Sequence, residues 1–193
     1  MNAITQIITQ QLTGRAVSTI AQRFGINETA ANAAVQIGVP LILTALARNA
    51  SQPQGAQDLH QAINNDHDGS ILDNLMGYLN NPQTANGAGI LNHVFGGNQP
   101  TVANNLAQAT GLDQNSANGV LETLAPLVMG AVGQKQQQNS LDASDLSQML
   151  NSQQQQAQEN APGVMGMLGS MLDQNQDGSA MDDLQRMAAK FFN

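Results

Sequence analysis

The sequence predicts an all-α protein, and three observations lead to this fold class. Hydrophobic residues make up 41% of the 193 residues and aromatic residues only 3%, so the core must be built from aliphatic side chains and Met, which favour helices. Short polar residues that suit helix starts stand before Ala-rich periodic runs. The two-residue alternation typical of half-buried strands is missing from the sequence.

Composition and charge also restrict the function classes. The chain has no Cys, which excludes disulfides, zinc ribbons and thiol catalysis. Six basic residues against fourteen acidic ones give a net charge of -8, which repels nucleic acid and anionic lipid. Residues 1–12 carry no basic segment, and no run reaches the roughly 18 apolar residues of a membrane helix. We therefore expect a cytoplasmic protein without membrane insertion.

The sequence contains an internal duplication. Residues 20–27 align with 106–113, and 39–42 align with 125–128, at a constant offset and without a gap. Residues 66–75 match 175–184 at a larger offset, so the second copy carries an insertion near 151–172. We expect a first helical repeat over 1–81 and a second over 82–193, which together form one packed domain.

The insertion has two parts of different composition. Four consecutive Gln at 153–156 form a low-complexity polar tract, which predicts a mobile linker. Residues 161–172 are rich in Gly and Met, and their apolar residues recur at helical spacing. This segment is expected to be a core-packing helix, with an adaptable hydrophobic contact surface as the alternative.

Helix boundaries follow from caps and prolines. Asn27 and Asp113 each follow a Gly-apolar pair and precede an Ala-rich run, so they are expected to cap helices. Pro40 and Pro126 remove a backbone donor and disfavour helical geometry in the preceding residue, so the helices are expected to break or kink there and restart. Both segments that begin at these prolines are apolar on nearly every face, which predicts two central helices.

Several phrases together resemble the bacterial YidB-like family, a domain family of unknown function. They are a Leu/Ile-Ala-x-x-x-Gly-Leu/Ile box, an Ala-rich helix with Ala/Val-Pro-Leu, Asp-His-Asp-Gly-Ser at 66–70, and Gly-Ala-Gly-Ile-Leu-Asn-His-Val-Phe-Gly at 87–96. The resemblance extends over about 16–184. It implies a helical fold with a homeodomain-like arrangement and no established activity.

Two acidic loops have the spacing of calcium-binding loops, with oxygen ligands at alternate positions and Gly at the sharp turn. The candidate ligands of the second copy are Asp173, Asn175, Asp177, Ser179 and Asp182. The candidate ligands of the first copy are Asn64, Asp66, Asp68, Ser70 and Asp73. Seven of the fourteen acidic residues lie in these two short segments, counting the neighbouring Asp183, and we expect Ca²⁺ as a cofactor of one or both.

Helix capping is the alternative interpretation of the same residues. Ser70 with Asp73, and Ser179 with Asp182, have the spacing of a capping box, in which Ser caps the helix and the acid reaches back. Asp-Gly before the Ser is an ordinary turn. Capping leaves the alternating acids ahead of each Gly unexplained.

The Ile-Ala-x-x-x-Gly-Ile box is also typical of a helix-turn-helix, in which Ala packs under the turn that Gly makes. A DNA-reading helix needs Arg or Lys, but residues 28–37 and 114–124 contain neither. The unit is therefore expected to be structural, with nucleic-acid binding as the runner-up function.

Catalytic constellations are missing from the sequence. None of the three His has a His or Glu partner at helical spacing for zinc, and neither a Gly-x-Ser-x-Gly elbow nor a Ser-x-x-Lys pair occurs. We expect a non-catalytic binding or structural module, not an enzyme, that binds an unidentified protein partner and Ca²⁺. A metal-dependent hydrolase that uses the loop carboxylates is the third candidate.

Overall fold

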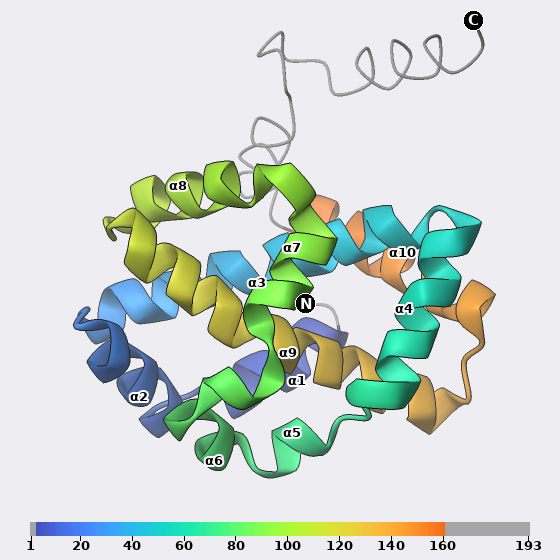
Figure 1. Ribbon diagram of the computed structural model, residues 1–193, viewed down its shortest axis with the longest axis horizontal. Helices are drawn as coiled ribbons and strands as arrows, with labels where there is room; N and C mark the ends of the chain where they lie inside the picture. Colours follow the sequence, from blue (N-terminus) through green and yellow to red (C-terminus); the bar gives the residue numbers. More distant parts are fainter. Residues whose placement is uncertain (1–2, 161–193) are drawn as a thin grey trace, which may run out of the picture.

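A computed structural model describes residues 3–160, and this part of the chain is all-helical, without a strand (Figure 1). The helices are α1 (Ala3–Gln11), α2 (Arg15–Phe24), α3 (Glu28–Ala50), α4 (Pro53–Asp66), α5 (Ser70–Asp73), α6 (Leu75–Asn80), α7 (Gly87–Phe95), α8 (Gln99–Thr110), α9 (Gln114–Asn139) and α10 (Ala143–Asn160), with the 3₁₀ turns η1 (Pro82–Ala85) and η2 (Gly96–Asn98). The predicted all-α class is confirmed.

Helices α3 and α9 form the centre of the bundle. Every residue from 41 to 47 and from 123 to 133 is buried, so both helices are covered on all sides, as their composition predicted. The two helices cross closely at Gly38, where an added Cβ would lie 2.9 Å from a methyl carbon of Leu124. Helices α1, α2, α4, α7 and α8 each contact both central helices, and the buried side chains of residues 4–150 form one continuous core.

The starts of α3 and α9 have the same local geometry. The side chain of Asn27 accepts a hydrogen bond from the N–H of Ala30 at 2.8 Å, and that of Asp113 accepts one from Ser116 at 3.0 Å. The preceding helices α2 and α8 end at Gly25 and Gly111, both left-handed. The two predicted caps are confirmed.

Of the break or kink expected at each proline, the break was wrong. Pro40 lies inside α3 and Pro126 inside α9, and both helices continue without interruption. A proline inside a helix costs about 3 kcal/mol. Burial on every face of these helices offsets that cost, because breaking either helix would expose the apolar residues that follow the proline.

The linker prediction for the Gln tract was also wrong, because α10 runs through residues 153–156. The helix is anchored by Leu146 and Leu150, both fully buried, where α10 contacts α3 and α4. The Ser147 hydroxyl also donates a hydrogen bond to the carbonyl oxygen of Ala50, at 2.7 Å. The Gly/Met-rich segment 161–172 lies outside the described residues.

Helix α3 departs from the expectation that no segment suits a membrane. By length and composition it could cross one, with a mean hydropathy of 1.7 over its most apolar window. In this fold 72% of that window is buried. Most of its apolar surface is therefore covered by the helices packed around it.

Candidate ligand-binding groove

The loop between α4 and α5 is held against α9 by glycine contacts. We call residues 66–70 the acidic loop. Gly69 has φ +99°, a conformation that favours glycine, and a Cβ there would lie 3.2 Å from the carbonyl oxygen of Gly130. On α9, a Cβ at Gly133 would lie 1.9 Å from the carbonyl oxygen of His67. Small residues on both sides thus let the acidic loop approach the helix backbone directly.

Asp68 organises the turn into α5. Its Oδ1 accepts a hydrogen bond from the backbone N–H of Ser70 at 2.9 Å, and bonding with Ser70 lowers the pKa of this exposed carboxyl. The predicted capping box is therefore wrong for this copy. Gly69 occupies the cap position and has no side chain to offer, so Asp68 takes the free N–H two residues ahead.

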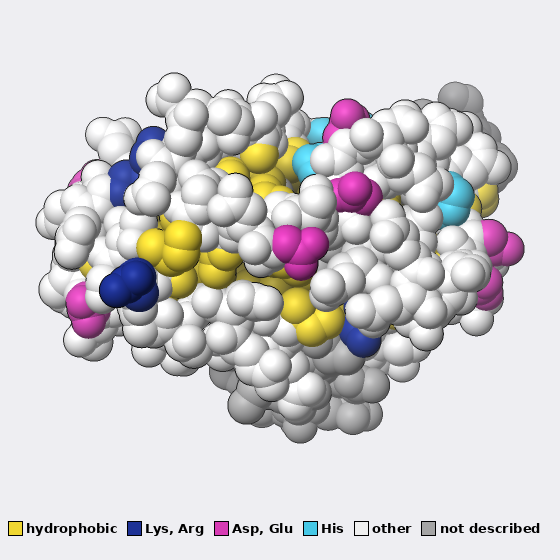
Figure 2. Space-filling view, turned by 90° about the horizontal axis from the view of Figure 1, so that it is seen from below, with side chains coloured by type: hydrophobic (Ala, Val, Ile, Leu, Met, Phe, Trp, Pro, Cys, Tyr) yellow, Lys and Arg dark blue, Asp and Glu magenta, His cyan; other side chains and the backbone are white. Residues whose placement is uncertain are grey.

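A polar cavity of about 750 Å³ lies between the acidic loop and the segment that leads through α6 and η1 into α7. It is lined by Asp66, His67, Asp68, Gly69, Ser70, Ile71, Asn74, Gly77, Tyr78, Asn81, Thr84, Ala85, Asn86 and Ile90. This lining offers carboxylates, amides and hydroxyls and contains neither Lys nor Arg. On the face in Figure 2, hydrophobic side chains emerge along a band across the middle, with acidic side chains beside it.

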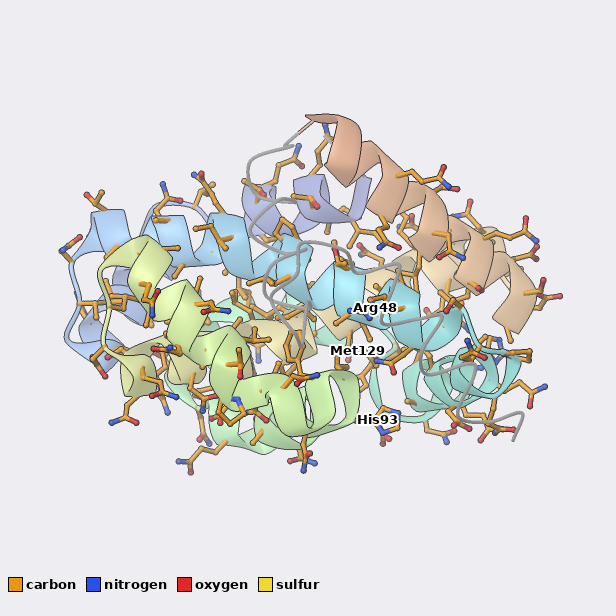
Figure 3. All side chains as sticks on the ribbon, turned by 90° about the horizontal axis from the view of Figure 1, so that it is seen from above. Arg48, His93 and Met129 are labelled. Carbon is orange, nitrogen blue, oxygen red and sulfur yellow. The ribbon has the colours of Figure 1, made fainter. Side chains whose placement is uncertain are left out.

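An apolar cavity of about 200 Å³ adjoins the polar one. It lies among α3, α4, α7 and α9, and its lining consists of Leu46, Asn49, Gly55, Asp58, Leu59, Ala62, His67, Asn86, Gly89, Ile90, His93, Val94 and Met129. In Figure 3, His93 lies at the end of α7 and Met129 lies between α7 and α3. The two cavities share three lining residues, His67, Asn86 and Ile90, and therefore lie side by side along them.

His67 stands where the cavities meet, and its surroundings act on its charge in opposite directions. Burial lowers the pKa of the imidazole, and the neighbouring carboxylates of Asp66 and Asp68 partly raise it. The net pKa lies below the usual value of a His, so the ring is favoured in its neutral form.

The wall opposite the acidic loop depends on Asn86 and Tyr78. Asn86 is left-handed (φ +47°), and its side chain accepts a hydrogen bond from the Gly89 N–H at the start of α7. The Tyr78 hydroxyl donates a buried hydrogen bond of 2.8 Å to the carbonyl oxygen of Thr123, and burial raises the pKa of this phenol. Tyr78 thus ties α6 to α9, and Asn86 caps the start of α7.

The structure brings together only part of the first predicted calcium loop. Asp66, Asp68 and Ser70 line the polar cavity. The Oδ1 of Asn64 instead accepts a hydrogen bond of 2.9 Å from the Nε2 of buried Gln136, and Asp73 lines a separate cavity.

Within residues 3–160, no group of three or more His, Asp or Glu side chains has the arrangement of a metal site. The second predicted loop, with Asp173, Asn175, Asp177, Ser179 and Asp182, lies outside the described residues.

Sequence reasoning missed most of the groove. Asn81, Thr84, Asn86 and Ile90 come from the second wall, and Met129 from the floor of the apolar cavity. A local signal existed for Asn86 alone, since an Asn before Gly-Ala-Gly suits a left-handed cap. The other residues reach the groove through tertiary packing.

The comparison with protein families shows which family the chain belongs to. The profile of a family described as bacterial proteins of unknown function, DUF937, matches residues 6–136. The chain belongs to the DUF937 family. The resemblance to YidB-like proteins is consistent with this family. The matched region contains all of α3, α9 as far as residue 136, and the whole lining of the polar cavity. No curated protein and no solved structure matches the chain.

Proposed function

We propose that this DUF937 protein is a non-catalytic binding module whose groove takes a positively charged ligand. The observation that carries the proposal is that the acidic loop, singled out by its sequence, lines the polar cavity of about 750 Å³. Asp66 and Asp68 supply negative charge, and the rest of the lining supplies neutral oxygens and amides without Lys or Arg. A concave site with these groups attracts cations and repels anions.

The geometry of Ser70 supports binding rather than catalysis. A nucleophilic Ser needs a base that takes its proton, and the base needs a group that orients it. Ser70 is bonded to Asp68 within its own turn, and His67 is held by burial in the adjoining wall. This arrangement disfavours a serine nucleophile at Ser70, and the metal-dependent hydrolase that would use the loop carboxylates stays the third candidate.

Calcium is the first cation to test, because Asp66, Asp68 and Ser70 of the predicted loop line the cavity. With Asn64 and Asp73 directed elsewhere, we expect weak affinity, on the order of 10⁻³ M. The second loop, 173–182, has a charged residue at its first position and is expected to bind Ca²⁺ more tightly.

The experiment is a backbone-amide NMR titration of the full chain with CaCl₂, with MgCl₂ as the matched salt. We expect saturable shifts of the acidic-loop amides below about 10 mM Ca²⁺. Asp68→Asn should abolish them while its amide oxygen still accepts the Ser70 N–H. Asp145→Asn, an exposed position on α10, is the control. Loop amides that respond equally to both salts, or not at all, would contradict calcium binding.

We also propose that the scaffold arose by duplication of a helix-turn-helix unit that now serves packing. The shared turn and cap geometry of α2–α3 and α8–α9 supports this proposal. Ala21 and Ala107 are buried at equivalent places beneath the two turns. Nucleic-acid binding remains the less favoured function, because residues 28–37 and 114–124 offer no basic side chain.

A further inference from the structure

From the way the two cavities meet, we infer that the groove binds an organic ammonium ion with an apolar body, the cationic head in the polar cavity and the body in the apolar cavity. This inference rests on the proposed cation-binding groove and names the class of its ligand. The juxtaposition of two unlike cavities along His67, Asn86 and Ile90 carries it.

The apolar cavity has the lining and size of a site for a short hydrocarbon group. Leu46, Leu59, Val94 and Met129 contribute side chains that are at most 9% exposed, so the cavity is walled by core residues. Its volume of about 200 Å³ accommodates roughly six methylene groups, since each takes about the volume of one water molecule, 30 Å³. Burying such a group removes apolar surface from water, which favours binding.

Charge decides which polar group the body carries. Three carboxylates, of Asp58, Asp66 and Asp68, line the two cavities, and no Lys or Arg lines either of them. A carboxylate or phosphate head would meet negative charge without a cationic partner, whereas an ammonium head finds carboxylate and amide acceptors. The lowered pKa of His67 keeps a competing positive charge out of the junction at neutral pH.

Hexylammonium is the probe, with hexan-1-ol and hexanoate as matched neutral and anionic compounds. Methionine-methyl NMR of the full chain follows the Met129 methyl in the apolar cavity, assigned with Met129→Leu, and backbone amides follow the acidic loop. We expect hexylammonium to shift both reporters with one dissociation constant. We expect hexan-1-ol to bind about tenfold more weakly and hexanoate to leave both reporters unchanged. Met149 on α10, outside both linings, should stay unchanged throughout.

Two variants separate the ends of the site. Ala62→Leu places a larger side chain in the apolar cavity and leaves less room for the ligand. It should weaken hexylammonium binding about tenfold and leave Ca²⁺ binding unchanged. Ala33→Leu, on an equally half-buried helical position outside the groove, should change nothing. The double variant Asp66→Asn, Asp68→Asn should remove the preference for hexylammonium over hexan-1-ol.

The outcomes distinguish this inference from the proposed function. Any of three results would overturn the inference. The Met129 methyl signal stays unchanged, hexanoate binds as tightly as hexylammonium, or the Met149 methyl signal shifts together with the signals of the groove. The selectivity among the three probes is measured on the unaltered protein and does not depend on the variants. Calcium binding without hexylammonium binding would leave the proposed function standing alone, and the reverse result would leave an organic-cation site without calcium.

Discussion

The Tyr78 hydroxyl donates a hydrogen bond of 2.8 Å to the main-chain oxygen of Thr123, joining α6 to the central helix α9. Tyr78 is 7% exposed, and it forms part of the polar cavity wall. The bond fixes the distance between this wall and α9, three residues before Pro126. The shape of the groove therefore depends on a contact between residues 45 positions apart.

Tyr78 should titrate far above the ordinary pKa of tyrosine, about 10. Burial raises the pKa of Tyr78 in the folded protein, so folding favours the protonated phenol. The stabilising contribution is complete below pH 10 and is lost as the pH rises above it, because the unfolded chain ionises first. The chain has one Tyr and no Trp, so phenolate absorbance reports this group directly. A midpoint near 10 in the folded protein would contradict the prediction.

Tyr78→Phe should cost about 1 kcal/mol of unfolding free energy, because it removes one hydrogen bond and keeps the apolar ring. Urea unfolding at neutral pH measures this cost. The variant should also lose the decline in stability above pH 10. If the stability of Tyr78→Phe declined above pH 10 as much as that of the wild type, groups other than Tyr78 would account for the decline.

Gly133→Ala should destabilise the protein by about 2 kcal/mol through overpacking, although alanine favours helices. The added Cβ would lie 1.9 Å from the His67 carbonyl oxygen, so the acidic loop must move away from α9. Chemical unfolding and loop amide shifts measure the two effects. Gly97→Ala is the matched control, since a Cβ at Gly97 meets no atom within 4 Å. Equal stability of the two variants would refute the close approach.

His67 should titrate below the usual His pKa of about 6.5. Because the folded pKa is lowered, the contribution of His67 to stability is complete above the unfolded pKa of about 6.5. It is lost as the pH falls from there through the lower folded pKa, because the unfolded chain takes up the proton first. Asp66→Asn removes a charge that raises the pKa and should lower the midpoint further. Imidazole NMR signals, assigned with His67→Asn, follow the titration. An unchanged or higher midpoint in Asp66→Asn would show that the Asp66 charge does not raise the pKa, and a wild-type midpoint at or above the usual value would contradict the effect of burial.

The two predicted repeats, 1–81 and 82–193, should not fold separately. Helices α3 and α9 each cover the apolar surface of the other, and α10 from the second half also contacts α3. Fragments cut between Tyr78 and Gly87 should lack cooperative thermal unfolding when expressed alone. A cooperative transition in either isolated fragment would identify independent domains.

The sequence by itself determined the helical class and the starts of the two central helices. The caps at Asn27 and Asp113 were predictable because each joins atoms three residues apart, so the interaction is present in the local sequence. The left-handed Gly25 and Gly111 are local in the same sense.

Tertiary structure decided what happens at the prolines and at the acidic loop. Pro40 and Pro126 continue their helices because distant helices bury the segments that follow, an energy that local propensity does not contain. Ser70 loses the predicted cap role because α5 begins at Ser70 itself, which puts Gly69 at the cap position, and Gly69 lies against α9. The groove itself joins residues 66–70 to residues 81–90 and Met129, and only packing across the bundle brings these side chains within reach of one ligand.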